Sequence, residues 1–213
     1  MIKIKSFVFS PFMENTYVIH NEKKECAIID PGCYGNEENG ALKAFIENNQ
    51  LKVVLLLNTH SHLDHIFGNA FVAKTWSVIP KVHPLDEPIY SNFEMSAQRF
   101  GIPTHTLPPE PSYTLEEGRS EFLGDQELEV MFLPGHCPGH VAFIHHESKT
   151  ILSGDVLFER SIGRTDLPGG DHYTLIKSIK EKLFLLPNDY TVYSGHGRPT
   201  SIGAEKKHNP YLQ

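Results

Sequence analysis

The sequence predicts an α+β fold in which two β-sheets pack together and helices cover their outer faces. Short strand-like segments end in turn residues, and amphipathic helical patterns separate them, which is typical of a layered sandwich. The 213 residues are 39% hydrophobic and 21% charged, the ordinary range for globular proteins. Without a linker, tandem repeat or low-complexity tract, we interpret residues 1–213 as a single domain.

The first half contains most of the predicted short strands. Asp30-Pro31-Gly32 is a turn signal at the end of the third strand. Leu42, Phe45 and Ile46 share one face of a predicted helix. We expect strands over residues 2–9, 16–20, 26–29, 53–57 and 77–82, helices over 37–49 and 66–76, and a proline-punctuated region over 84–111 that is helical over 88–100.

The second half of the chain also contains predicted strands and a predicted amphipathic helix. Alternating or continuous apolar residues predict strands over 128–133, 141–146, 150–153 and 189–194. Leu175, Ile176 and Ile179 have the spacing of an apolar helix face, which predicts a helix over 173–185.

Composition limits the partners. The formal charge is -7 with histidine neutral, and no basic run is present, which argues against nucleic-acid binding. No apolar stretch has the length of a membrane span, and the start of the chain has no apolar signal region. We therefore expect a cytoplasmic protein without a membrane partner. Three cysteines without CxxC spacing indicate buried or loop thiols instead of a disulfide framework.

The run Thr59-His-Ser-His-Leu-Asp-His65 directly follows the predicted strand over 53–57. Side chains alternate in extended backbone, so His60 and His62 point to the same side. Asp64 and His65 fall where the chain turns toward a helix, and they can face a second ion. A histidine-rich surface loop is the alternative, but the density of donors predicts metal binding.

Three later motifs place further donors at predicted strand ends. They are His136 in Pro-Gly-His-Cys-Pro-Gly-His, Asp155 in Ser-Gly-Asp and His196 in Ser-Gly-His-Gly. A glycine-flanked histidine alone is usually a turn residue with a solvated ring. Their recurrence at strand ends predicts that one sheet edge brings them together. Cys137 is interpreted as a small turn residue, and His140 either as a hydrogen-bond partner of a ligand or as an ordinary turn histidine.

In this order, the motifs THSHLDH, HCPGH, SGD and SGHG resemble those of the metallo-β-lactamase-fold hydrolases. The resemblance implies a four-layer αβ/βα sandwich with a two-metal site at one edge. It implies that His60, His62 and His136 hold one divalent ion, that Asp64, His65 and His196 hold a second, and that Asp155 bridges both. It makes Asp64 and Asp155 the catalytic carboxylates. The ligand types suit zinc, with iron or manganese as alternatives.

Residues 161–171, 197–200 and 205–211 are similar to the short bacterial glyoxalase II-like branch, whose relatives hydrolyse S-D-lactoylglutathione. The expected reaction is attack by a metal-bridging hydroxide on a small-molecule thioester. The chain ends soon after His196, without the helical extension that binds glutathione in longer enzymes, so another thioester remains open. Arg164 is a candidate for substrate binding, and a structural ion pair with Asp166 or Asp171 is the alternative.

Three other functions are alternatives. A persulfide dioxygenase of the same fold shares the HxHxDH motif and uses one iron ion and dioxygen. A metal-dependent nuclease conflicts with the acidic composition. A non-catalytic metal-binding module needs only four ligands, whereas this chain offers seven.

Overall fold

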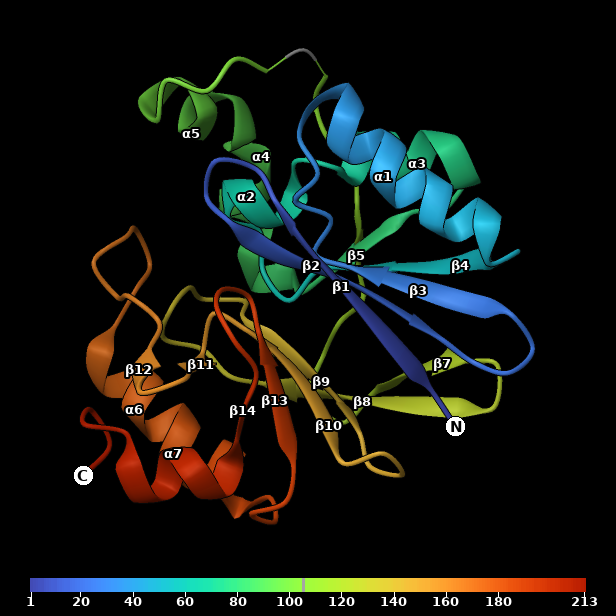
Figure 1. Ribbon diagram of the computed structural model, residues 1–213. Coiled ribbons are helices and arrows are strands. Elements are labelled where there is room, and N and C mark those ends of the chain that lie inside the picture. The colour runs from blue at the N-terminus through green and yellow to red at the C-terminus, as the bar shows by residue number, and fades with distance from the viewer. Residues whose placement is uncertain (105) are drawn as a thin grey trace.

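Two mixed β-sheets face each other in the computed structural model, which describes residues 1–104 and 106–213 (Figure 1). The first sheet has the order β1 (Lys3–Phe9), β2 (Glu14–His20), β3 (Glu25–Ile29), β4 (Lys52–Leu57), β5 (Pro80–Val82) and β6 (Ser112–Tyr113). The second has the order β14 (Thr200–Ser201), β13 (Thr191–Ser194), β10 (Thr150–Gly154), β9 (Val141–His145), β8 (Gln126–Phe132) and β7 (Ser120–Leu123). Strands β11 (Leu157–Phe158) and β12 (Ser161–Ile162) form a separate hairpin.

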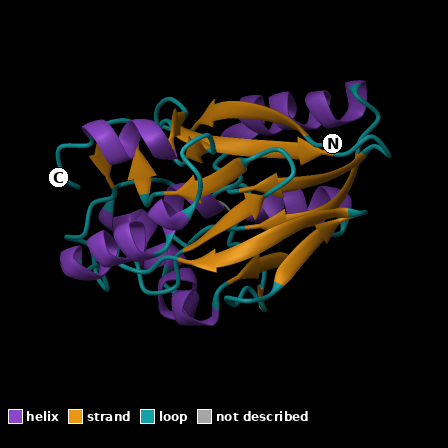
Figure 2. Cartoon of the chain, turned by 90° about the horizontal axis from the view of Figure 1, so that it is seen from below, coloured by secondary structure: helices purple, strands orange, loops and turns teal. Residues whose placement is uncertain are grey.

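Helices flank the strands on both sides of the molecule (Figure 2). They are α1 (Gly35–Asn48), α2 (Leu63–Ile66), α3 (Asn69–Trp76), α4 (Glu87–Ser91), α5 (Phe93–Arg99), α6 (His172–Glu181) and α7 (Ile202–His208). Two 3₁₀ turns, Pro84–Asp86 and Leu183–Leu185, precede α4 and follow α6. In the described part of the chain, no helix combines the length and the apolar character that a membrane crossing needs.

Alternation along the strands divides the core into layers. On β2, Tyr17 and Ile19 face the second sheet, whereas Val18 faces the helices α1 and α3. On the other side, Leu175 and Ile179 of α6 pack against the outer face of the second sheet. Strands covered on both faces are apolar on both faces, as β3 is. These layers confirm the predicted four-layer α+β sandwich.

The structure corrects several predicted boundaries. The helix predicted over 66–76 starts only at Asn69, and Ile66 instead ends the short helix α2; between them, the backbone N–H of Gly68 donates to the carbonyl of Pro31 at 2.7 Å. The strand predicted over 77–82 starts only at Pro80, since Ser77 ends α3 in the left-handed conformation with φ 57°. The helix predicted over 173–185 ends at Glu181 and continues as a 3₁₀ turn. We did not predict the short strands β6, β7, β11, β12 and β14 or the helices α2 and α7.

Candidate metal centre

The loops that follow β4, β8, β10 and β13 meet at one edge of the two sheets, as the strand-end positions predicted. The backbone N–H of Val141 donates to the carbonyl of Thr59 at 2.8 Å and joins the two sheets there. The N–H of Gly195 donates to the carbonyl of Gly154 at 2.8 Å, and that of Asn15 donates to the carbonyl of Gly195 at 2.7 Å. These hydrogen bonds fix the loops that carry the predicted donors.

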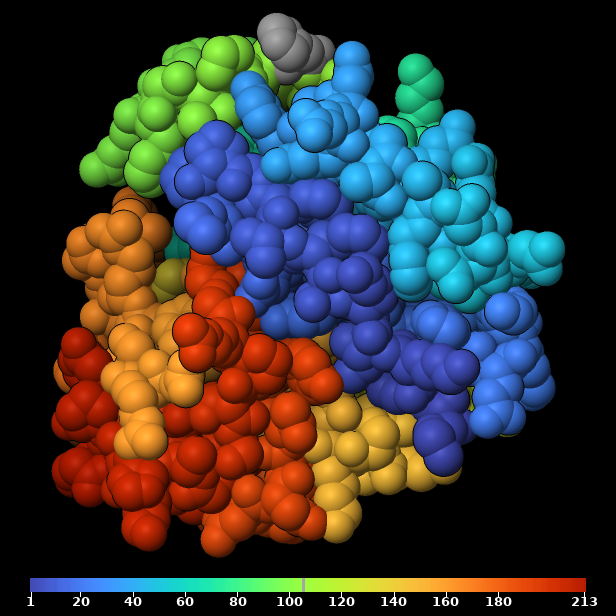
Figure 3. Space-filling model, in the orientation of Figure 1, coloured from blue at the N-terminus to red at the C-terminus, as the bar shows by residue number. Residues whose placement is uncertain are grey.

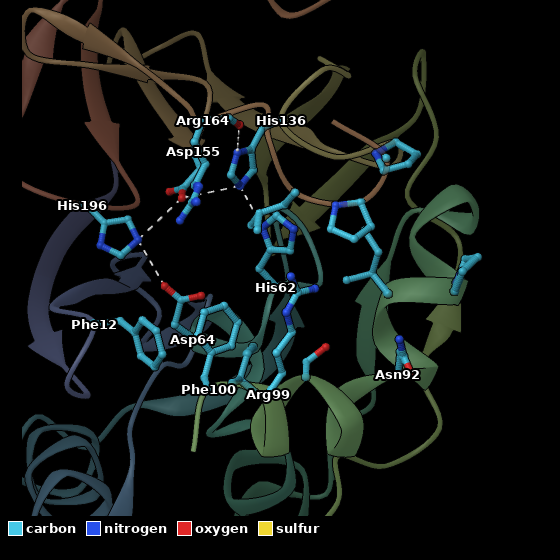
Figure 4. Close-up of a pocket in the computed structure, with 18 of the residues that line it drawn as sticks. Phe12, His62, Asp64, Asn92, Arg99, Phe100, His136, Asp155, Arg164 and His196 are labelled. Atoms are coloured by element: carbon cyan, nitrogen blue, oxygen red, sulfur yellow. Dashed lines mark hydrogen bonds and ion pairs between the residues drawn. The ribbon is translucent and has the colours of Figure 1, made fainter. Parts of the chain in front are cut away.

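His60, His62 and His136 form one compact group. Their ligand nitrogens lie within 4.8 Å of one another. The Nδ1 of His62 is 2.8 Å from the Nε2 of His136 (Figure 4). Three imidazole nitrogens this close together are a donor set that would suit one divalent ion.

Asp64, His65 and His196 form a second group, in which the Nε2 of His196 lies 3.2 Å from the Oδ2 of Asp64. Asp155 lies between the groups. Its Oδ2 is 3.6 Å from the Nε2 of His136 and 3.5 Å from that of His196. The structure therefore brings together all seven residues predicted as ligands.

Outer hydrogen bonds orient these rings. The Nδ1 of His136 is 2.7 Å from the carbonyl oxygen of Arg164, and that of His196 is 3.2 Å from the carbonyl oxygen of Met13. The Nδ1 of His65 is 3.1 Å from the Oδ2 of Asp30. A proton shared with an oxygen at Nδ1 leaves the Nε2 lone pair free to bind a metal, as in many metal-binding histidines.

The Asp30 carboxylate forms hydrogen bonds with two residues. Besides His65, it accepts hydrogen bonds from the backbone N–H and the hydroxyl of Thr59, at 2.7 and 2.6 Å. Asp30, His60 and His65 also lie close enough together to hold an ion. Since these hydrogen bonds already use the Asp30 carboxylate, we interpret it as a support for His65.

Asp86 ties the two histidine-bearing loops together. Its buried carboxylate accepts backbone hydrogen bonds from Ser61 and from Gly139, each at 2.7 Å. Ser61 lies between His60 and His62, and Gly139 follows the loop of His136. The carboxylate therefore fixes the spacing of loops from different sheets.

His140 is fully buried next to the predicted ligands. Its Nε2 accepts a 3.0 Å hydrogen bond from the backbone N–H of Asp155, and its ring stacks on that of His60 at 4.7 Å. His140 is therefore a hydrogen-bond partner of Asp155, a predicted ligand, and not an ordinary turn histidine. Gly154 is required beside it, because φ is +49° and a Cβ would overlap with Thr59.

Electrostatics favour a cation at this place. Burial lowers the pKa of His62 to about 3 and lowers the pKa of His60 well below its ordinary value, so both rings are neutral, as metal binding requires. Burial opposes ionisation of Asp155, but the nearby histidines, foremost His65, hold its pKa well below the usual value. Burial also opposes charge on His65, yet the surrounding carboxylates, foremost that of Asp155, raise its pKa.

The residues fit divalent ions. Among the described residues, the Nε2 atoms of His60 and His65 and the Oδ1 of Asp155 are buried without a hydrogen-bond partner. Unpartnered buried polar atoms are costly, and metal coordination satisfies them. Imidazole and carboxylate ligands suit zinc, iron and manganese. The Cys137 thiol is buried, and burial raises its pKa, which agrees with an inert turn residue.

A cavity of about 860 Å³ opens onto the donors. His62, Asp64, His136, Asp155 and His196 line it (Figure 4). In Figure 3 the surface is hollowed between the green α4–α5 segment and the orange segment that follows β11. The volume is typical of a small-molecule site.

Arg164 lines this cavity and also forms the ion pair that was its alternative role. Its Nε and one terminal nitrogen each lie 2.7 Å from the Asp166 carboxylate. Asp166 is thus the partner, and Asp171 instead caps α6.

Sequence reasoning missed Asp30 and Asp86 as supporting residues. Asp30 directly follows β3, so the strand-end signal used for Asp155 was available for it, but we interpreted it only as part of a turn. Asp86 lies in the proline-rich region, and no local pattern points to its role.

The match to known families agrees with this geometry. The family model of the metallo-beta-lactamase superfamily matches residues 10–196. The chain therefore belongs to the metallo-beta-lactamase superfamily of metal-dependent hydrolases, whose fold implies bound divalent ions.

Among its relatives, the hydroxyacylglutathione hydrolase GloC of Haemophilus influenzae is 39% identical, over 99% of this chain and 98% of that protein. The crystal structure of TTHA1623 in a di-iron-bound form is 36% identical, with a TM-score of 0.87 over 98% of this chain and 100% of the other. The BLEG-1 B3 metallo-beta-lactamase is also 36% identical, with a TM-score of 0.86 over 99% and 100%.

Proposed function

We propose that this chain is a thioester hydrolase of the glyoxalase II type that works with two divalent ions. The observation that carries the proposal is the convergence of seven donors, three with unpartnered buried atoms, at the base of an open cavity. The likeness to GloC along nearly the whole of both chains supports the glutathione-thioester class.

Each ion has its own set of protein ligands in this proposal. His60, His62 and His136 hold one ion, and Asp64, His65 and His196 hold the other. Asp155 would be shared, because its carboxylate lies between the two groups: it is 3.5 Å from the Nε2 of His65 and 3.6 Å from that of His136.

When bound, the two ions supply Lewis-acid chemistry that polarises a carbonyl and acidifies water. The protein residues orient the ligand side chains. Asp30 and the Arg164 carbonyl hold the rings of His65 and His136, and Asp64 and Asp155 present their carboxylates to the cavity, where the substrate carbonyl must lie.

Two measurements on the purified protein test the proposal together. Elemental analysis should find about two divalent ions per chain, by the count of ligands. Hydrolysis of S-D-lactoylglutathione and of other acyl thioesters should be measured beside oxygen uptake with glutathione persulfide and hydrolysis of a β-lactam.

Thioester turnover with two ions bound supports the proposal. A single iron ion with persulfide-dependent oxygen uptake would show instead the dioxygenase that the sequence left as an alternative. The proposal would also be overturned if the protein hydrolysed the β-lactam but none of the thioesters. The di-iron form of TTHA1623 leaves zinc and iron both open, so the identity of the metal is part of the measurement.

A further inference from the structure

The α4–α5 segment gives the cavity an exposed apolar wall. Leu85, Met95 and Phe100 are 54%, 65% and 47% exposed, and all three line the cavity. Phe12 and Phe158 extend the apolar lining. Large apolar side chains gathered around a cavity beside reactive groups are typical of a surface that binds an apolar part of a ligand.

An unpaired cation interrupts this apolar lining. Arg99, the last residue of α5, points into the cavity (Figure 4). Among the described residues, no carboxylate lies within ion-pair distance of its guanidinium. Arginine binds carboxylates and phosphates through two parallel hydrogen bonds, so a free guanidinium in a cavity is a recognition group for an anion.

Arg164 differs from Arg99 in this respect. Its guanidinium forms a two-point ion pair with Asp166, which balances its charge in the same cavity. In a chain with a formal charge of -7, an unpaired cation at this place provides the local attraction that an anionic substrate needs. Arg99 is therefore better placed than Arg164 to bind an anion.

We propose that the cavity selects thioesters with an anionic thiol carrier and an apolar acyl group, and that Arg99 binds the anionic group. The proposal rests on the thioester hydrolase function above and deepens it. A lactoyl group is small and hydroxylated, so it leaves the wall of Leu85, Met95 and Phe100 largely uncovered. A longer apolar acyl group covers these side chains and gains the free energy of their burial.

Binding of stable thioethers tests the proposal without relying on turnover. The probes are S-hexylglutathione, S-methylglutathione and the neutral S-hexyl thioether of N-acetylcysteamine, titrated calorimetrically into the metal-loaded protein. Glutathione thioethers carry two carboxylates. The variants are Arg99→Met, Arg99→Lys and the control Arg119→Met, since Arg119 pairs with Glu116 outside the cavity.

We expect Arg99→Met to weaken S-hexylglutathione binding about 10- to 100-fold, the loss of a charged hydrogen-bonding partner. The neutral thioether should change less than about twofold, and Arg99→Lys should retain part of the affinity. S-Hexylglutathione should bind at least about tenfold more tightly than S-methylglutathione, because the hexyl chain buries more apolar surface.

Several results would overturn this inference. One is equal binding of S-hexylglutathione to the unchanged protein and to Arg99→Met, and another is equal binding of the hexyl and methyl thioethers. A complete lack of binding would overturn it as well. If the thioethers bind as expected but no thioester is hydrolysed, the proposed hydrolase function fails while the assignment of Arg99 as the anion-binding residue stands.

Discussion

The Oδ1 of Asp86 accepts a 2.7 Å hydrogen bond from the backbone N–H of Gly139, although 53 residues separate the two in the sequence. The Oδ2 of the same side chain accepts an equal hydrogen bond from Ser61. One buried carboxylate thus fixes the relative position of the loops that carry His60, His62 and His136.

Replacing Asp86 should destabilise the fold and loosen the centre. Asp86→Ala leaves two buried N–H groups without acceptors, which should cost about 2–4 kcal/mol in the free energy of unfolding. Asp86→Asn keeps one acceptor and should cost less. Urea unfolding measures the loss, and elemental analysis should show less bound metal. The control Asp125→Ala removes an exposed carboxylate and should leave both unchanged. Normal metal content in Asp86→Ala would contradict the positioning role.

Asp155→Ala should remove the ligand that we assign to both ions. We expect metal content to fall from about two ions per chain to less than one, with loss of thioester hydrolysis. Circular dichroism should show that the fold is retained. Asp189→Ala, which removes a surface partner of Lys149, is the control. If Asp155→Ala kept full metal content and normal turnover, the ligand assignment would be wrong.

Gly195→Ala should disturb the centre by steric overlap. A Cβ at this position would overlap with the Oδ1 of Asp155 and press on the ring of His65, so the carboxylate must move. We expect reduced metal retention in a folded protein. Gly40, exposed in α1 with open space around it, is the matched control. Gly40→Ala should stabilise the helix by about 0.5–1 kcal/mol and leave metal content unchanged. Full retention in Gly195→Ala would show that the carboxylate tolerates displacement.

Removing the metal should lower stability. A chelator removes the positive ions that balance the carboxylates of the centre, and it leaves buried nitrogen and oxygen atoms without partners. An ion at 100 times its dissociation constant stabilises the folded state by about 2.7 kcal/mol, provided it does not bind the unfolded chain. Thermal unfolding should therefore show a lower Tm after chelation, restored by zinc, iron or manganese. The ion that restores both Tm and turnover identifies a functional metal, whereas an unchanged Tm would argue against a tightly bound centre.

The seven predicted donors could be picked out from the sequence because each lies at the end of a strand and within a short motif. Strand ends such as Ser153-Gly154-Asp155 combine an apolar run with glycine, and both signals are local. The ends of the helices and strands were less predictable from the sequence. Ser77 adopts a left-handed conformation that ends α3, and nothing local to Ser77 requires it. The short strands β7 and β14 depend on pairing with β8 and β13.

By itself, the sequence determined the fold class and placed seven candidate donors at strand ends, because strand alternation, turn residues and metal-ligand residue types are all recognisable within a few consecutive positions. Only the tertiary structure decided how the donors are supported and what surrounds them. Asp86 accepts hydrogen bonds from Ser61 and Gly139, which lie 25 and 53 positions away in the sequence. Arg164 is paired with Asp166 and Arg99 has no such partner, and this difference depends on which side chains lie nearby in the folded protein. Hydrogen bonds and ion pairs depend on distances of a few ångströms, and folding alone sets these distances between remote parts of the chain.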